Sequence, residues 1–318
     1  MKNILILSVG RRVELVQAFS AELKCRFTGT LVFAAEMNPD YSAACHVADG
    51  RFAVPKVTAV DYAETLIDLC LTNKIGLVVP TIDTELLPLA FEANRFAENG
   101  IHLILSSSEL IGLCRDKRKT ALLFDKIGLS YPEIYPRDAI QFPCFAKPFN
   151  GSCSIGASAV LSSDQLTQSM LDDESLIFQK LIDSSYTEYT VDAYYNRSGK
   201  LCCLVPRERL EVRAGEVSKG VTRRHQVYEY LLPHLSLLNG ARGCITFQLF
   251  AKPEEGEFYA LEINPRFGGG YPLSYCAGAN YPGWLIDEYL LGKEIGFIED
   301  WKNNLMMLRY DSKILVHG

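Results

Sequence analysis

The stretch that decides the fold is a short apolar strand followed by a turn rich in glycine, Leu261-Glu262-Ile263-Asn264-Pro265-Arg266-Phe267-Gly268-Gly269-Gly270. In a β-strand, residues two apart point to the same face, so Glu262 and Asn264 present two oxygen atoms side by side. A carboxylate and an amide oxygen suit Mg²⁺, which completes its coordination with water and phosphate. Arg266 adds a cationic fork, and the glycines let the backbone approach a bulky anion.

The segment before this strand predicts its partner. Residues 245–250 alternate apolar and polar side chains, and Pro253-Glu254-Glu255-Gly256 is typical of a turn. We therefore expect 245–250 to pair antiparallel with 257–264, which places Gln248 beside Glu262. The alternative is a solvated strand end with a glycine-rich turn and no ligand.

Gln248, Glu262 and Asn264-Pro265-Arg266 together resemble the metal-binding signature of the ATP-grasp superfamily, in the form found in the large subunit of carbamoyl phosphate synthetase. The resemblance implies that Gln248, Glu262 and Asn264 bind Mg²⁺, with Mn²⁺ as an alternative ion. It also implies a catalytic role for Arg266, which together with the glycines 268–270 would hold the acyl phosphate or the acid. Gln248 stands where most relatives have an acid, so the negative charge of the predicted site is lower here.

The resemblance covers nearly the whole chain and implies its division. A Rossmann-like pre-ATP-grasp domain would span 1–110 and an ATP-grasp domain 111–318. The latter would consist of a small nucleotide-binding lobe, 111–180, and a C-terminal lobe with the metal site, 181–318. The predicted fold class is therefore α/β and α+β, a parallel sheet followed by a two-lobed ATP-grasp fold.

The first hundred residues support this division independently, because strands alternate with helices there. Strands are predicted at 3–8, 31–35, 52–54, 77–80 and 101–105, and helices at 12–23, 61–73 and 84–98. This order predicts a doubly wound parallel sheet, in which ligands bind beyond the carboxyl ends of the strands. The polar residues at these ends are either ligand contacts or solvated caps: Ser8, Gly10, Arg11, Arg12, Glu36, Thr81, Asp83 and Glu85.

This N-terminal part resembles the domain that helps to form the acceptor-substrate pocket of ATP-grasp enzymes. Ser8-Val9-Gly10 lacks the full G-x-G-x-x-G pattern, which disfavours a dinucleotide such as NAD as its ligand.

Two lysines are predicted to contact the nucleotide phosphates. The charged run 115–120 opens a helix that continues to about Ile127; such runs are often solvated, but Asp116-Lys117 resembles the pair whose lysine reaches the phosphates in ATP-grasp enzymes. Lys147 ends a strand and precedes a Gly/Ser-rich loop, so it offers a fixed cation beside free backbone N–H groups. This order resembles the ATP-grasp phosphate flap, with an ordinary hairpin as the alternative, and implies that the loop residues Gly151, Ser152, Ser154 and Gly156 bind phosphate.

The sequence predicts a strand at residues 176–182, and the resemblance implies that this strand is the hinge between two nucleotide-binding lobes. Gln179, Lys180 and Ile182 would then lie beside adenine. Glu188 would accept hydrogen bonds from the ribose hydroxyls, unless it is only an exposed strand residue.

The basic stretch after strand 201–206 is harder to assign. Six basic residues lie between 207 and 224 in a segment rich in Gly and Glu, which suggests either a solvated loop or a site for the γ-phosphate and an anionic substrate. Arg207 is the first candidate for a catalytic role because it ends a strand. Helices are predicted near 225–238 and 283–292, with a final strand or helix from Leu305.

The composition indicates a globular protein without disorder, since 48% of the 318 residues are apolar and 22% are charged. A net charge of −6 and a pI near 5.5 argue against a nucleic-acid partner. No apolar run approaches the roughly 18 residues of a membrane span, and ten cysteines without a C-x-x-C pair indicate reduced thiols. We therefore expect a cytoplasmic protein.

The resemblance implies an ATP-dependent carboxylate–amine ligase of the C–N bond-forming class, or a carboxylate–thiol ligase, that acts through an acyl phosphate. The expected partners are ATP, small-molecule carboxylate and amine substrates and, as an open alternative, a second copy in a homodimer. The large subunit of carbamoyl phosphate synthetase resembles two fused copies of such a unit, so its full activity is not expected. The alternative function is an ATP-binding protein of the same fold without ligase activity.

Overall fold

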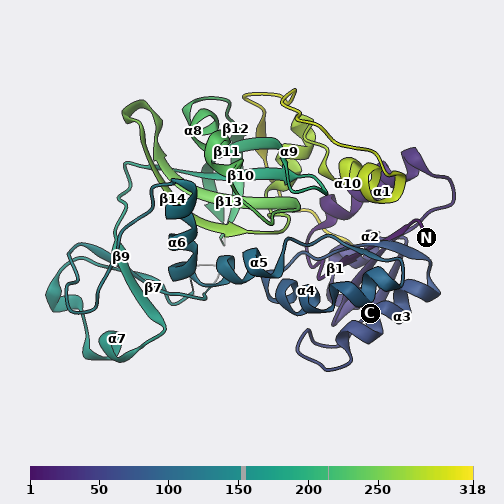
Figure 1. Ribbon diagram of the computed structural model, residues 1–318, viewed down its shortest axis with the longest axis horizontal. Helices are drawn as coiled ribbons and strands as arrows, with labels where there is room; N and C mark the ends of the chain where they lie inside the picture. Colours follow the sequence, from purple (N-terminus) through teal and green to yellow (C-terminus); the bar gives the residue numbers. More distant parts are fainter. Residues whose placement is uncertain (152–154, 214, 318) are drawn as a thin grey trace.

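The computed structural model describes residues 1–151, 155–213 and 215–317 and begins with a five-stranded parallel sheet (Figure 1). Its strand order is β3-β2-β1-β4-β5, and every neighbouring pair is parallel. The strands are β1 (Asn3–Leu7), β2 (Val32–Glu36), β3 (Gly50–Ala53), β4 (Ile75–Val79) and β5 (His102–Leu103). The predicted doubly wound sheet is confirmed.

Helices cover both faces of this sheet, which explains why its strands are almost wholly apolar. Ile4 and Ile6 share a core with α1 (Val13–Arg26), whereas Leu5 and Leu7 pack with α3 (Tyr62–Thr72) and α4 (Asp83–Glu98). The short η1 (Pro39–Tyr41) and α2 (Ala43–Val47) were not predicted.

A smaller antiparallel sheet follows, in the order β6-β9-β7-β8. Its strands are β6 (Ile134–Tyr135), β7 (Cys144–Pro148), β8 (Ser158–Val160) and β9 (Leu176–Lys180), with η2 (Ser163–Gln165) and α7 (Gln168–Asp172) between the last two. The predicted strand 176–182 ends at Lys180, so Ile182 lies beyond it.

The structure has two helices where one was expected from residue 115 to about 127, and the second of them corresponds to the expected helix. They are α5 (Ser108–Arg115) and α6 (Lys117–Ile127), and Asp116 separates them. The Asp116 carboxylate accepts a hydrogen bond from the backbone N–H of Arg118 at 2.9 Å and so caps α6.

The third sheet is antiparallel, has the order β14-β13-β10-β11-β12-β15 and lies between the other two in Figure 1. Its strands are β10 (Thr187–Tyr195), β11 (Leu201–Arg213), β12 (Glu216–Thr222), β13 (Gly243–Lys252), β14 (Glu257–Asn264) and β15 (Met306–Leu308). The connections contain α8 (Gln226–Leu235), η3 (Pro253–Glu255), α9 (Tyr271–Ala277) and α10 (Tyr281–Leu291). The expected pairing of 245–250 with 257–264 is confirmed.

The reading of residues 207–220 as a solvated loop is wrong. Strand β11 continues to Arg213 and pairs with β12, so that Arg207 lies opposite Thr222. Charged side chains are tolerated along this strand because acids on neighbouring strands pair with them: Arg207 with Asp192, and Arg209 with Glu188.

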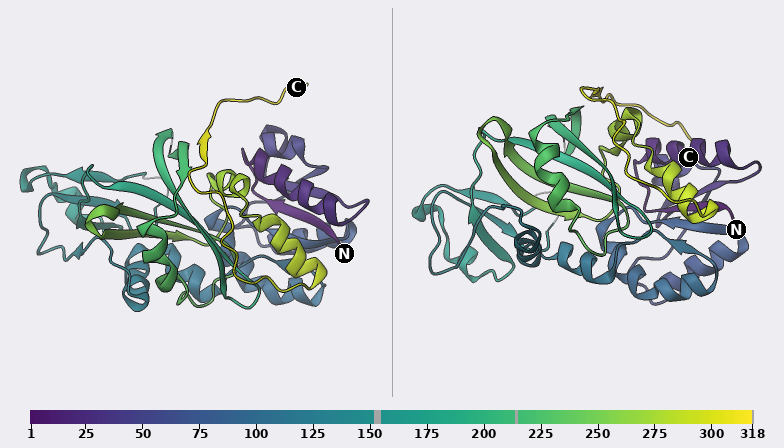
Figure 2. Two further views of the ribbon diagram at one scale, coloured as in Figure 1. Left: turned by 90° about the horizontal axis from the view of Figure 1, so that it is seen from above. Right: turned by 45° about the horizontal axis from the view of Figure 1, so that its top comes forward.

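The N-terminal sheet is docked onto the C-terminal helices, because α1 packs against both α9 and α10 (Figures 1 and 2). Arg26 on α1 forms a bidentate ion pair with Asp287 on α10, with both N–O distances 3.0 Å. No helix within the described ranges is both long and apolar enough to cross a membrane.

Candidate active site

The centre of the candidate site is the β13–β14 hairpin. Gln248 lies directly opposite Glu262 in the antiparallel register. The Asn264 amide donates a hydrogen bond to Glu262 Oε1 at 2.9 Å, so these two side chains share a face as predicted. The structure thus brings together one carboxylate and two amides, which is a sparse but suitable oxygen set for Mg²⁺.

A β-bulge at Leu261 shapes the strand beside this group. Glu262 pairs with Gln248 and Ala260 pairs with Leu249, which leaves Leu261 without a partner residue. Because a bulge interrupts the alternation of side chains, Ala260 and Leu261 both line one cavity although they are consecutive. The sequence pattern did not reveal this bulge.

That cavity, here called the lysine cavity, has a volume of about 10 Å³ and lies between α6, the small sheet and β14. Its lining residues include Lys117, Lys147 and Gln179, which were predicted to contact ATP. Lys117 Nζ donates a hydrogen bond to the carbonyl of Gly151 at 2.6 Å, which connects the start of α6 to the predicted phosphate loop.

Both lysines are charged groups in a poorly solvated place. Burial and, to a smaller extent, the like charge of Lys117 lower the pKa of Lys147 to about 8, against the attraction of Glu262. Burial also lowers the pKa of Lys117, against the attraction of Glu262. Among the described residues, no carboxylate lies within 4.0 Å of either ammonium group. Two unpaired cations beside one carboxylate fit the phosphates of a nucleotide bound with a divalent cation.

The remaining predicted nucleotide residues are spread around this cavity. Gly156 adopts a φ of +72°, which favours glycine, whereas Ser152 and Ser154 lie outside the described residues. Gln179 is buried on β9, and its exposed neighbour Lys180 donates a hydrogen bond to the Tyr259 hydroxyl at 3.1 Å. Lys180 and Ile182 do not line the lysine cavity.

Glu188 on β10 is largely buried and is ion-paired with Arg209 of β11. Burial raises its pKa, Arg209 opposes this shift, and the charge of Glu262 adds to it. Glu188 thus lies close enough to Glu262 for the two charges to interact, but its carboxylate already has a cationic partner.

Arg266 holds the glycine turn against the N-terminal domain. Its Nε and Nη2 lie 3.2 and 2.8 Å from one oxygen of Asp83, at the start of α4. Arg12, from the opposite side, donates hydrogen bonds to the carbonyls of Phe267 at 3.2 Å and Thr81 at 3.1 Å. Burial and the nearby charge of Arg266 lower the pKa of Arg12 to about 10.

Arg207 lies underneath the turn rather than at a cavity surface. It is 1% exposed and forms a bidentate ion pair with Asp192, whose carboxylate also accepts a hydrogen bond from the Ser274 hydroxyl at 2.6 Å. Its Nη1 has no partner among the described residues and packs against Gly270. A direct contact of Arg207 with phosphate remains a prediction.

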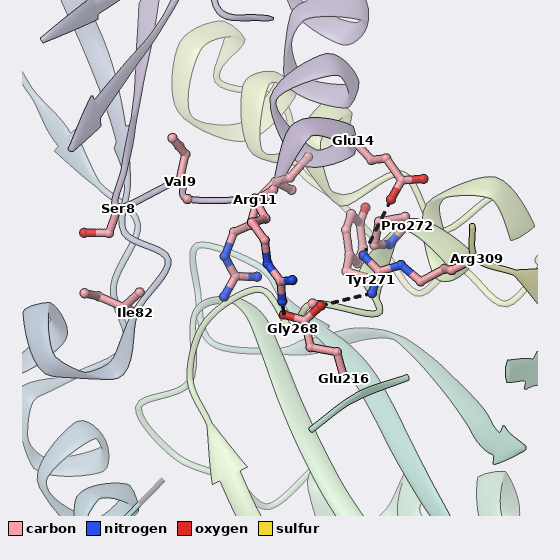
Figure 3. A pocket seen from close by; sticks show the side chains of 14 residues that line it. Ser8, Val9, Arg11, Glu14, Ile82, Glu216, Gly268, Tyr271, Pro272 and Arg309 are labelled. Atoms are coloured by element: carbon pink, nitrogen blue, oxygen red, sulfur yellow. Dashed lines mark hydrogen bonds and ion pairs between the residues drawn. The ribbon is translucent and has the colours of Figure 1, made fainter. Parts of the chain in front are cut away.

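A second cavity, here called the arginine pocket, lies on the other side of the turn and has a volume of about 210 Å³ (Figure 3). The residues predicted from the strand ends and the turn that line it are Ser8, Gly10, Arg11, Arg12, Gly268 and Gly269. Glu85 lies behind it, fully buried, where it accepts hydrogen bonds from the Ser8 hydroxyl at 2.7 Å and the Thr81 amide at 2.6 Å.

Sequence reasoning missed three charged residues of this pocket. Glu14, Glu216 and Arg309 come from α1, β12 and the segment after β15. The sequence pattern indicated only the basic residues around position 216 as candidates. No local pattern connects positions that lie some 90 to 300 residues apart.

Comparisons with known proteins agree with this architecture. Residues 4–104 match a family model described as the PylC-like N-terminal domain, and residues 173–309 match one described as ATP-grasp in the biosynthetic pathway with Ter operon. No curated protein sequence matches the chain.

Solved structures share the fold at low sequence identity. The biotin carboxylase domain of 2-oxoglutarate carboxylase from Hydrogenobacter thermophilus has a TM-score of 0.74 at 17% identity, over 96% of this chain and 73% of that one. Biotin carboxylase from Campylobacter jejuni has a TM-score of 0.75 at 16% identity, over 96% and 74%. N5-carboxyaminoimidazole synthetase from Staphylococcus aureus, in complex with ADP, has a TM-score of 0.70 at 14% identity, over 93% and 79%. The predicted ATP-grasp resemblance and fold class are confirmed.

Proposed function

Since the chain has the ATP-grasp fold and matches an ATP-grasp family model, we propose that it is an ATP-dependent ligase that joins a small carboxylate to an amine, or to a thiol. The observation that carries the proposal is the pair of half-buried lysines, Lys117 and Lys147, which lie near Glu262 and have no ion-pair partner in the described parts of the chain. Desolvated cations without partners are costly, and a bound phosphate chain would remove that cost.

In this proposal the residues in and around the lysine cavity have separate tasks. Lys117 and Lys147 bind the phosphates, with the backbone around Gly151. Gln179, Lys180 and Ile182 lie at the adenine, and Glu188 at the ribose. Glu262, Asn264 and Gln248 would hold Mg²⁺, which supplies positive charge to the phosphate oxygens when bound.

The reaction is a transfer in two steps. A carboxylate oxygen of the substrate attacks the γ-phosphorus of ATP and ADP leaves, which gives an acyl phosphate. The amine nitrogen then attacks the acyl carbon, the C–O bond to phosphate breaks, and the nitrogen loses a proton. The residues of this chain act by positioning and by neutralising charge, because phosphoryl transfer needs its oxygens held in line. Arg266 and the glycine turn would hold the acyl phosphate.

The first test is ligand-induced stabilisation. A ligand that binds only the folded state at 100 times its Kd stabilises it by about 2.7 kcal/mol, so Mg-ATP should raise the melting temperature by several degrees and NAD should not. Lys117→Met should abolish the effect, whereas Lys119→Met, an exposed lysine on the same helix, should preserve it. Stabilisation by NAD and not by ATP would refute the proposal.

The second test separates a ligase from a protein that only binds ATP. ADP release should be measured with Mg-ATP over a matrix of small carboxylates against amines and thiols. A ligase releases ADP only when an acid is present and forms its product only with an added nucleophile. Nucleotide binding with no ADP release over the whole matrix would favour the binding protein.

A further inference from the structure

The arginine pocket contains one arginine, Arg12, with no carboxylate oxygen within 4.0 Å among the described residues, although Glu216, Asp83 and Glu85 are near enough to act on its charge. The guanidinium of Arg12 donates only to the backbone carbonyls of Phe267 and Thr81, and no acid in the described residues forms an ion pair with it. The other two arginines of the pocket, Arg11 and Arg309, do have acidic partners. A cation of this kind in a pocket wall is a ready site for a carboxylate.

The same pocket also contains negative charge. Glu216 lies 3.5 Å from Arg11 and 3.2 Å from Arg309, which also reaches Glu14 at 3.8 Å (Figure 3). The Glu14 and Glu216 side chains are 56% and 45% exposed. Ion pairs exposed to this degree are weak, so a ligand ammonium group can compete for the Glu216 carboxylate.

The volume of the arginine pocket limits the size of its ligand. A cavity of about 210 Å³ holds roughly seven waters at about 30 Å³ each, which is enough for a small metabolite but not for a nucleotide. The acids on the rim would repel a second carboxylate, so a dicarboxylate fits less well than a molecule that carries one charge of each sign.

We propose that the arginine pocket binds an α-amino acid, with its carboxylate at Arg12 and its ammonium group at Glu216. This inference rests on the proposed ligase function and names one of its two substrates. Arg12 contacts Phe267, next to Gly268, so the bound amino acid lies against the turn that follows the metal-binding strand. Glu216 and Arg309 then close the pocket from the C-terminal lobe.

The test compares amino acids with analogues that lack one charge. The probes are the twenty common L-amino acids, together with propionate, glutarate and ethylamine, each added to the full chain with Mg-ATP. At least one amino acid should stimulate ADP release tenfold or more above all three analogues. Equal stimulation by propionate or glutarate would overturn the amino-acid assignment and leave the ligase intact.

Variants then locate the binding site. Glu216→Gln should raise the KM for the active amino acid about 10- to 100-fold with little change in kcat, because one charged hydrogen bond to the ligand is weakened. Glu211→Gln, on the neighbouring strand β11 and paired with Lys219, is the matched control and should leave KM unchanged. An unchanged KM in Glu216→Gln would overturn the proposed contact.

Arg12 needs a second measurement because it also links two segments of backbone. Arg12→Lys keeps the charge but loses the fork, so the KM for the amino acid should rise while that for ATP stays constant, with melting temperature recorded in parallel. Calorimetric titration of the same amino acids without nucleotide distinguishes the two failures. If amino acids bind but Mg-ATP does not, the ligase proposal fails alone; if Mg-ATP binds but no amino acid does, the amino-acid proposal fails alone.

Discussion

The lysine cavity and the arginine pocket lie on two sides of one strand and turn, residues 261–270, but they differ in whether their basic side chains are paired with acids. The lysine cavity is small, about 10 Å³, and its two ammonium groups have no carboxylate partner among the described residues. The arginine pocket is larger, about 210 Å³, and two of its three arginines are already paired with acids. The first therefore fits the proposed nucleotide phosphates, and the second fits the proposed amino acid.

The two cavities also differ in the room that they offer to a ligand. A nucleotide cannot enter a cavity of about 10 Å³. Lys147 is on β7 of the small sheet, whereas Glu262 is on β14 of the large sheet. A nucleotide bound between these two sheets must therefore extend beyond the cavity, whereas the arginine pocket has room for a small ligand as it stands.

The largest expected effect comes from removing the one carboxylate of the predicted metal site. Glu262→Gln keeps the size of the side chain and its hydrogen bond with Asn264, but loses the charge. Loss of one preorganised electrostatic contact to the transition state typically costs about 3 to 4 kcal/mol, so kcat at saturating Mg²⁺ should fall by roughly 10² to 10³.

In the same experiment the amino-acid KM and the melting temperature should change little, because Glu262 does not line the arginine pocket. Glu257→Gln, exposed at the other end of β14, is the control. A kcat near that of the wild type would mean that Glu262 takes no part in catalysis. It would also contradict the proposed difference in function between the two cavities.

An intermediate effect concerns the stability of the nucleotide-free protein. Burial lowers the pKa of Lys147 from 10.5 to about 8, so the charged lysine opposes folding below pH 8. Lys147→Met should raise the free energy of unfolding at pH 7 by about 1 to 3 kcal/mol, since each pKa unit corresponds to about 1.36 kcal/mol.

The stability difference between the wild type and Lys147→Met should depend on pH, because the folded and unfolded wild type bind different numbers of protons at Lys147. Between pH 8 and 10.5 the unfolded wild type binds more protons than the folded one, so wild-type stability rises with pH in this window. The advantage of Lys147→Met should therefore shrink from pH 8 to 10.5 in urea titrations. A difference that does not depend on pH would mean that Lys147 is not a desolvated cation.

The last pair of variants, which includes the smallest expected effect, compares two neighbouring glycines of the turn between the cavities. A Cβ at Gly270 would overlap the buried guanidinium of Arg207 and lie 2.7 Å from Val217 Cγ1, so Gly270→Ala should lower the free energy of unfolding by about 1 to 3 kcal/mol. A Cβ at Gly269 would meet only the end of the flexible Glu216 side chain at 3.2 Å. Gly269→Ala should change stability by less than about 0.5 kcal/mol. Equal losses in thermal unfolding would contradict the packing of Arg207 under Gly270.

Much of the architecture was predictable because it depends on local periodicity. Alternating strands and helices identified the parallel sheet, and two alternating strands around a turn placed Gln248 opposite Glu262. Strand and turn signals extend over a few residues, and the period of two fixes which side chains share a face. The bulge at Leu261 was not predictable, since one extra residue leaves the composition of the strand unchanged.

The sequence by itself determined the order of the sheets and the positions of Lys117, Lys147, Glu262 and Asn264 on their elements. Only the tertiary structure decided which charged groups are neutralised: Arg207 is buried against Asp192, whereas Arg12 is left without an acid among the described residues. It also decided that Glu216 and Arg309 complete a pocket that begins at Ser8. The physical reason is that backbone conformation follows from neighbouring residues, while the charge state and partners of a side chain depend on groups brought close by packing over hundreds of residues.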